Sequence, residues 1–396
     1  MTLFSSPYLD ADLQRYPARK NDTLRAWDAA DELIISYLFE NKTCFKRSEV
    51  LIVNDNFGAL AVNLASQIDE GSHQLNIASD SFLSRQGILQ NMRTNSLDFN
   101  RISLYSTVQL WEEVSMPKLD LVLIKIPKSL AELEFQLNCL RKFIHADTQI
   151  IAGGMTKTIH NSTLKLFERY IGQTKTSLAK KKARLIFAIV DEANTVIPDL
   201  NWNLTSYSLP AGLIDGIQPK ITSYPGVFSH DKLDMGTRLL LENLHVDAIK
   251  AERILDLGCG AGVIGIVASL VNSTARVSFV DESLLAIKSA QANARHLLTD
   301  RLDKLQFAAT DCTDGIEDDS QDLVLNNPPF HERGGRTHQV SRSMFVGAKR
   351  VLRSGGSLLI VSNRHLGYHK VLETIFDNCQ LIASNAKFVV LRSINR

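Results

Sequence analysis

The residues best suited to chemistry lie at the end of a predicted strand, in the segment Asp322-Leu-Val-Leu-Asn-Asn-Pro-Pro-Phe330. Proline cannot donate a hydrogen bond to a sheet, so we expect the strand to end at Asn327. The Asn327 amide oxygen and the Pro328 carbonyl can both accept from one exocyclic NH2 group, which leaves its nitrogen free to react. Phe330, after Pro329, can lie against the face of a planar substrate. These residues predict a site that holds an amine attached to a flat ring.

A glycine-rich turn upstream predicts what the amine reacts with. Arg253-Ile-Leu-Asp-Leu-Gly-Cys-Gly-Ala-Gly-Val-Ile-Gly265 is typical of a strand, a turn and a helix. Glycine has no Cβ, so the backbone of this turn can pass close to a ligand. The Gly-x-Gly-x-Gly spacing after Asp-Leu favours S-adenosylmethionine over a dinucleotide, because there is no diphosphate to cradle. The predicted cofactor contacts here are Asp256, Gly258, Cys259, Gly260 and Gly262.

Acidic residues at the ends of the next two predicted strands extend the cofactor site. The strand 277–281 ends in Asp281, whose carboxylate can accept from both ribose hydroxyls. Asp311 follows the strand-like segment 305–309 and can accept from the adenine amino group. A lone acid at a strand end is more often a solvated loop residue, but this order after the glycine turn favours a cofactor. With their neighbours, the predicted contacts are Asp281, Glu282, Asp311 and Cys312.

The elements that position these residues recur along the chain, because strand-like and helix-like segments alternate in both halves. This alternation predicts an α/β fold with a parallel sheet. Three segments of the first half match the second half in the same order: 51–58 with 254–261, 120–128 with 322–330, and 179–186 with 383–390. The order favours a duplicated domain over two unrelated domains with generic strands. We expect two tandem Rossmann-like class I methyltransferase domains, each a mostly parallel twisted sheet flanked by helices.

The chain of 396 residues is too long for one ordinary core. The predicted domains are residues 1–190 and residues 226–396. Between them, residues 191–225 are rich in proline and glycine, and we interpret them as an interdomain region with room for short strands.

The first domain lacks the features that would bind a cofactor. The repeat places Asp55 and Phe57 at the positions of Gly258 and Gly260. A phenylalanine ring there would fill the space that the cofactor needs. We therefore expect residues 1–190 to bind no S-adenosylmethionine.

The first domain also has Lys125 in place of Asn327. An ammonium group donates hydrogen bonds, so it would repel the amine that an amide oxygen accepts from. The role left for this domain is RNA binding, although any single lysine is more often an ordinary solvated side chain. The candidate phosphate contacts are Lys125, Lys128, Lys157, Lys180, Lys181, Lys182 and Arg184.

Composition, charge and cysteine spacing argue against several classes of protein. The net charge is only +1, so an RNA would be held by local basic patches rather than by the whole surface. The five cysteines show no metal-ligand spacing, so we expect free thiols and no metal. No signal peptide or membrane span is evident. We expect a cytoplasmic monomer with no membrane association and no obligate protein partner.

Over nearly its whole length the sequence resembles the tandem-domain ribosomal RNA guanine-N2 methyltransferases of bacteria, and among them the large-subunit methyltransferase G family. The segments that carry the resemblance are 13–17, 26–32, 122–128, 181–185, 280–283, 327–331 and 363–366. Segments 225–229 and 234–237 resemble the family's stretch that helps to close the cofactor pocket. Cofactor contacts are thereby implied at Asp256, Gly258, Gly260, Asp281 and Asp311, and amine contacts at Asn327 and Pro328.

The resemblance implies an activity that spacing and composition do not give. It implies methylation of the N2 amine of one guanine in 23S ribosomal RNA, guanine 1835 in the customary numbering, with a preference for protein-free or immature RNA. Three alternatives stay open. They are a 16S guanine-N2 methyltransferase, a protein-glutamine or adenine-N6 methyltransferase, and a non-catalytic RNA-binding assembly factor.

Overall fold

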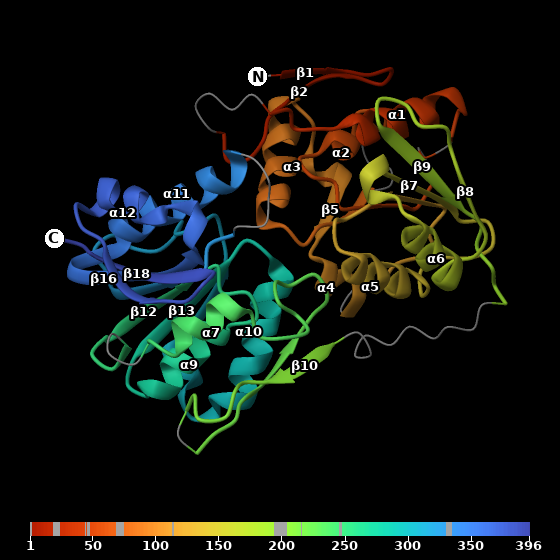
Figure 1. The fold of residues 1–396 in the computed structure, drawn as a ribbon. Coiled ribbons are helices and arrows are strands. Elements are labelled where there is room, and N and C mark those ends of the chain that lie inside the picture. Colours follow the sequence, from red (N-terminus) through yellow and green to blue (C-terminus); the bar gives the residue numbers. More distant parts are fainter. Residues whose placement is uncertain are drawn as a thin grey trace. The chain divides into compact units, whose positions relative to one another are not determined.

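The computed structural model describes residues 2–18, 24–43, 45, 48–68, 75–112, 115–193, 204–214, 216–244, 248–329 and 335–396. Phe330, a predicted catalytic residue, lies outside them. The chain divides into two compact units, Met1–Asn203 and Leu204–Arg396. Each unit contains one seven-stranded sheet and one two-stranded hairpin (Figure 1). No helix in the described parts of the chain is long and apolar enough to cross a membrane.

The sheet of the second unit has the order β14-β13-β12-β15-β16-β18-β17. All neighbours are parallel except β18, which runs antiparallel to both β16 and β17. Helices α7, α9 and α10 cover one face, and α11 and α12 cover the other (Figure 1). The strands are β12 (Arg253–Leu257), β13 (Arg276–Asp281), β14 (Leu305–Ala309), β15 (Gln321–Asn326), β16 (Leu352–Asn363), β17 (Gln380–Ser384) and β18 (Phe388–Ile394). The helices are α7 (Met235–Leu241), α9 (Val263–Val271), α10 (Leu284–Leu297), α11 (Gly335–Val351) and α12 (Tyr368–Phe376).

The first unit repeats this arrangement with the order β5-β4-β3-β6-β7-β9-β8. Its strands are β3 (Val50–Val53), β4 (Leu75–Ala78), β5 (Ile102–Tyr105), β6 (Leu121–Lys125), β7 (Gln149–Met155), β8 (Thr174–Thr176) and β9 (Ala183–Ala188). Its helices are α1 (Ala29–Glu40), α2 (Ala59–Ala65), α3 (Phe82–Thr94), α4 (Thr107–Glu112), α5 (Leu130–Leu140) and α6 (Asn161–Tyr170). Short 3-10 turns in the two units are Phe99–Arg101, Thr156–Thr158, Thr299–Lys304 and Arg364–Leu366. The predicted α/β fold with two tandem domains is confirmed.

The central strands explain why the sheets are parallel and buried. All four residues of β3 and all five of β6 are buried, and four of the five residues of β12 are too. Such continuous apolar runs are expected where helices cover both faces of a sheet, whereas a half-exposed strand would alternate. Each sheet therefore forms the core of its own unit and presents its strand ends as a fixed edge.

A hairpin precedes each sheet, and the second one changes the predicted domain boundary. The first hairpin is β1 (Thr2–Ser5) with β2 (Asp10–Leu13), and the second is β10 (Thr205–Ser208) with β11 (Lys220–Ser223). The second belongs to the unit that begins at Leu204. The predicted interdomain region 191–225 overlaps this unit from residue 204 onward, and β10 and β11 are short strands of the kind expected there.

The strand registers align the two halves and correct the predicted repeat. Val53 pairs with Ile124 between β3 and β6, and Leu257 pairs with Asn326 between β12 and β15. In addition, Gly58 and Gly262 precede α2 and α9 with the same left-handed backbone, φ +89° and +81°. In this alignment, the first-unit residues that correspond to Gly258 and Gly260 are Asn54 and Asn56. The expectation of Asp55 and Phe57 was wrong by one residue, because similar sequence patterns do not fix register.

Candidate active site

The predicted site residues gather at the carboxyl edge of the second sheet. The chain continues from β12 to β13 on one side, whereas β15 pairs with β12 on the other side. Such a reversal of strand order opens a crevice beyond the strand ends, where open α/β sheets bind their ligands. The ends of β12, β13, β14 and β15 bring together Asp256, Asp281, Asp311 and Asn327, which are far apart in the sequence.

The glycine turn after β12 has the backbone that the sequence predicts. Gly258, Gly260 and Gly262 have φ values of +74°, +54° and +81°. A Cβ on Gly262 would lie 2.9 Å from the Ala290 Cβ, so this glycine allows α9 and α10 to pack closely. A Cβ on Gly260 would meet nothing within 4 Å. The turn at Gly260 therefore faces open space, where a ligand can approach the backbone.

A buried carboxylate and a half-buried one hold this turn. Asp256 is fully buried, and its Oδ2 accepts from the Gly265 N–H at 2.8 Å. Asp281, at the end of β13, accepts from the Gly260 N–H at 2.9 Å and from the Ser283 N–H at 3.0 Å. The Asp256 Oδ1 is buried without a hydrogen-bond partner among the described residues. Asp256 thus retains an acceptor for a ligand. Asp281 also accepts from the Glu282 N–H, and a carboxylate with about four acceptor positions keeps one of them for a ligand.

Burial also sets the charge of these acids. It raises the pKa of Asp256 to about 7, an effect to which the nearby Asp281 charge adds and which the Gly265 N–H opposes. Burial likewise raises the pKa of Asp281 above its ordinary value. Carboxylates with raised pKa values favour a cationic ligand, since a nearby positive charge stabilises their ionised forms.

The Asn327 amide is oriented by the N-terminus of α7. Its Nδ2 donates to Thr237 Oγ1 at 2.8 Å and lies 3.4 Å from Asp234 Oδ2. Asp234 is the N-cap of α7 and accepts from the Thr237 N–H at 2.8 Å. A carboxylate only accepts hydrogen bonds, so the amide NH2 must face it. The Asn327 Oδ1 consequently points away, and it is buried with no partner among the described residues. This atom is the acceptor that the sequence predicted for an amine.

The residues around Asn327 fix the turn on both sides. Asn326, the last residue of β15, donates from Nδ2 to the Leu257 carbonyl at 2.6 Å and so joins β15 to the glycine turn. The strand thus ends one residue before the predicted position. Pro328 is buried and Pro329 is exposed. The Pro329 carbonyl accepts from Ser341 Oγ at 3.4 Å.

The remaining predicted cofactor residues lie at the neighbouring strand ends. The turn after β14 is joined to β13, because the Thr310 N–H donates to the Asp281 carbonyl at 2.9 Å. Asp311 is half-buried there, and Cys312 packs against the apolar core with φ +51°. Glu282 is exposed beside Asp281.

Sequence reasoning missed Asn293, which lies on α10. Its Nδ2 donates to the Ala261 carbonyl of the glycine turn at 2.9 Å and to the Thr222 carbonyl at 2.8 Å. Its Oδ1 accepts from the Thr222 N–H at 2.8 Å. Asn293 therefore joins the β10–β11 hairpin to the cofactor turn. A single asparagine on a helix gives no sequence signal for this role.

The first unit has a matching asparagine in the same place. Asn91 donates to the Phe57 carbonyl at 2.6 Å, and it accepts from the Gln14 N–H and donates to the Gln14 carbonyl at 2.9 and 2.8 Å. The duplication thus extends to individual hydrogen bonds. A similar bond comes from a different position: Asp55, which aligns with Cys259, accepts through its buried Oδ2 from the Ala61 N–H at 2.8 Å, whereas in the second unit Asp256 accepts from the Gly265 N–H.

The counterpart of Asn327 in the first unit is a buried ion pair. Lys125, at the end of β6, is 5% exposed, and its Nζ lies 2.7 Å from Asp28 Oδ1 and 2.7 Å from Asp31 Oδ1. Asp28 caps α1 as Asp234 caps α7. The prediction that Lys125 contacts RNA phosphate is therefore wrong, because its ammonium forms ion pairs with Asp28 and Asp31 inside the domain.

The other predicted RNA contacts remain on the surface. Lys180, Lys181 and Lys182 are exposed between β8 and β9, and Arg184 is half-buried in β9. Lys181 Nζ also lies 2.7 Å from Glu32 Oε2. Among the described residues, no group of three or more His, Cys, Asp or Glu could hold a metal ion.

Both halves of the chain match known family models. Residues 1–192 match the RLMG N-terminal domain, and residues 218–392 match the Methyltransferase small domain. The chain is 40% identical over 99% of both chains to a protein of Streptomyces avermitilis named Ribosomal RNA large subunit methyltransferase G. It is 39% identical over 96% of both chains to a protein of the same name from Vibrio vulnificus.

A solved structure shares the whole fold. It is the T. thermophilus 16S rRNA N2 G1207 methyltransferase in complex with AdoMet and guanosine. The TM-score is 0.75 at 21% identity, and the match covers 100% of this chain and 98% of the other. At this identity the likeness shows the tandem fold alone.

Proposed function

The chain belongs to the ribosomal RNA large subunit methyltransferase G family, and from this we propose that it methylates the N2 amine of one guanine in 23S ribosomal RNA. The target would be guanine 1835 in the customary numbering. The observation that carries the proposal is the Asn327 Oδ1, an acceptor whose amide is fixed by Thr237 and which has no hydrogen-bond partner in the described parts of the chain. The enzyme uses S-adenosylmethionine, and the buried Asp256, the half-buried Asp281 and the open backbone at Gly260 fit it.

The residues of this site would act by positioning. When bound, S-adenosylmethionine supplies an electrophilic methyl group on a sulfonium. Asp256 would hold its methionine ammonium directly or through water, Asp281 its ribose hydroxyls and Asp311 its adenine amine. The Asn327 Oδ1 and the Pro328 carbonyl would accept hydrogen bonds from the guanine amine. Holding both reactants in line supplies most of the rate enhancement without a strong base.

A guanine inside folded RNA must leave its stack to reach Asn327. We expect Lys128, Lys180, Lys182 and Arg184 of the first unit to contribute phosphate contacts, which give affinity without sequence preference. Lys181 would add to them after release from Glu32. A base that must be turned out is easier to reach before ribosomal proteins cover it. The proposal therefore includes a preference for protein-free or immature RNA, and action in the cytoplasm as a monomer.

Mass mapping of ribosomal RNA from a strain that lacks this gene tests the proposal. We expect 23S RNA to lose a single methyl group from one guanine and 16S RNA to be unchanged. Loss of a methyl group from 16S RNA instead would favour the small-subunit alternative. Unchanged RNA in both subunits would contradict the proposal, and so would restoration of the lost methyl group by an Asn327→Ala gene.

The affinity for S-adenosylmethionine should rise with pH across the neutral range. A pKa of about 7 leaves Asp256 protonated at lower pH, whereas a cationic ligand requires its ionised form. The affinity should then increase by up to about tenfold per pH unit from roughly pH 5.5 to 7 and level off above. Calorimetry in buffers of different ionisation enthalpy should show proton release on binding. Asp256→Asn should flatten this profile, and a flat profile for the unchanged chain would contradict the role of Asp256.

A further inference from the structure

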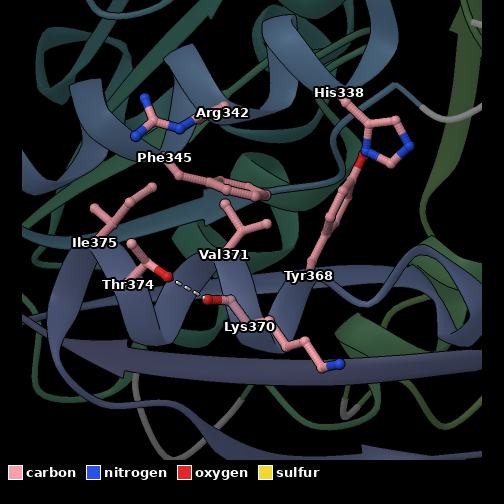
Figure 2. A pocket seen from close by; sticks show the side chains of 8 residues that line it. All are labelled: His338, Arg342, Phe345, Tyr368, Lys370, Val371, Thr374 and Ile375. Atoms are coloured by element: carbon pink, nitrogen blue, oxygen red, sulfur yellow. Dashed lines mark hydrogen bonds between the residues drawn. The ribbon is translucent and has the colours of Figure 1, made fainter. Parts of the chain in front are cut away.

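A groove between α11 and α12 lies on the second unit beside the transfer site. It has a volume of about 290 Å³. Figure 2 shows His338, Arg342 and Phe345 projecting from α11, and Tyr368, Lys370 and Val371 from α12. Phe345 and Tyr368 are buried and pack edge to face with their ring centroids 5.3 Å apart. The groove therefore has a rigid apolar floor beneath an exposed basic rim.

The charge of the groove is one-sided. Arg342 and Lys370 are exposed at opposite ends of the groove, and His338 lies edge to face with Tyr368. Among the described residues that line the groove, there is no carboxylate. Cations along an apolar floor are suited to a ligand that combines a phosphate with a flat or aliphatic body, as a nucleotide does.

The first unit provides an internal comparison, because α5 and α6 occupy the places of α11 and α12. There, Glu134 on α5 accepts from the Tyr170 hydroxyl of α6 at 2.8 Å and pairs with the Arg169 guanidinium at 3.2 Å. A carboxylate thus joins the two helices and neutralises the neighbouring cation. The basic groove is therefore a feature of the unit that carries the transfer site, and it is not a general consequence of the fold.

A chain of hydrogen bonds connects the groove floor to the site. The Tyr368 hydroxyl donates to Ser341 Oγ at 2.9 Å, and Ser341 Oγ donates to the Pro329 carbonyl at 3.4 Å. Tyr368 and Ser341 are both buried. A ligand on this floor would consequently lie two side chains from the turn that presents Asn327.

We propose that this groove binds the RNA strand at a nucleotide that flanks the target guanine, with one backbone phosphate at Arg342 and another at Lys370, at opposite ends of the groove. The sugar or base of that nucleotide would lie on the apolar floor at Val371. Contacts to nucleotides that flank a flipped base add to the binding and selection of the strand. The inference rests on the proposed function, since it takes RNA as the substrate.

The test compares charge removal in the groove with charge removal elsewhere on the same unit. The groove variant is Arg342→Gln with Lys370→Gln. Its matched control is Arg276→Gln with Lys250→Gln, two exposed cations at the amino end of the sheet, opposite the site. Equilibrium binding of protein-free 23S ribosomal RNA is measured over a range of salt concentrations, together with kcat, the KM for RNA and the Kd for S-adenosylmethionine.

Loss of two phosphate contacts should raise the KM for RNA roughly tenfold. It should also reduce the slope of log K for RNA binding against log salt concentration (the salt slope) by about 1.4. The kcat at saturating RNA and the Kd for S-adenosylmethionine should be unchanged, and the control pair should match the unchanged chain. Thr374→Glu places a carboxylate in the groove, as Glu134 does between α5 and α6, and it should also weaken RNA binding.

Two results would overturn the groove proposal in distinguishable ways. If the unchanged chain methylates 23S RNA but the groove variant keeps its KM and salt slope, the groove does not bind RNA and the proposed function stands. If the unchanged chain transfers no methyl group to 23S RNA, the proposed function fails and the groove proposal fails with it.

Discussion

Asn327→Ala is expected to slow methyl transfer by roughly two to three orders of magnitude and to leave the affinity for S-adenosylmethionine nearly unchanged. The substitution removes the buried Oδ1 that would accept from the guanine amine. It leaves the glycine turn intact, because the turn is held by Asp281 and joined to β15 by Asn326. Loss of one fixed group that stabilises a transition state costs roughly 10²- to 10³-fold in kcat. Single-turnover transfer to 23S RNA and calorimetry of cofactor binding measure the two effects separately.

The matched variant is Thr237→Val. It removes the hydroxyl that accepts from the Asn327 NH2 at 2.8 Å and keeps the acceptor oxygen itself. Since Asp234 still lies 3.4 Å from Nδ2, the amide should keep much of its orientation and the loss of kcat should be smaller. Full activity of Asn327→Ala would show that another group holds the amine. Loss of cofactor binding in that variant would place Asn327 in the cofactor site instead.

Lys125→Ala should destabilise the first unit by about 3–5 kcal/mol, the usual cost of removing one partner from a buried ion pair. Burial alone would lower the pKa of Lys125, but the charges of Asp31 and Asp28 together raise it above its ordinary value. The substitution therefore leaves the negative charges of Asp28 and Asp31 without the buried cation that compensates them. Hydrogen exchange should rise in peptides from residues 1–193 and remain unchanged in peptides from residues 204–396.

Lys175→Ala is the control, because this lysine is exposed on β8 of the same unit. We expect Lys175→Ala to show the same hydrogen exchange as the unchanged chain. A double variant, Lys125→Met with Asp31→Asn, should recover part of the lost stability since it removes charge from both sides. Equal exchange in Lys125→Ala and Lys175→Ala would contradict the structural role given to Lys125.

The parts of the site that the sequence predicted are those whose chemistry is local. The positive φ values at Gly258, Gly260 and Gly262 follow from glycine in a tight turn, and the end of β15 follows from two prolines. The alternation of strands and helices predicted both sheets, because continuous apolar strands need helices on both faces.

The parts that the sequence did not predict depend on partners far along the chain. Thr237 lies 90 residues from Asn327, and Asp28 lies 97 residues from Lys125. A lysine that is buried beside two aspartates looks the same in sequence as a solvated one. Register posed the same difficulty, since the match of Phe57 to Gly260 differed from the observed pairing by one residue and only the strand ladders showed it.

Transfer of labelled methyl groups to protein-free 23S and 16S ribosomal RNA, followed by mapping of the modified nucleotide, tests the central claim most directly. The account predicts one methyl group per 23S RNA, on the N2 amine of a single guanine, and none on 16S RNA. A methyl group on 16S RNA, or on any atom other than a guanine N2 amine, would contradict it.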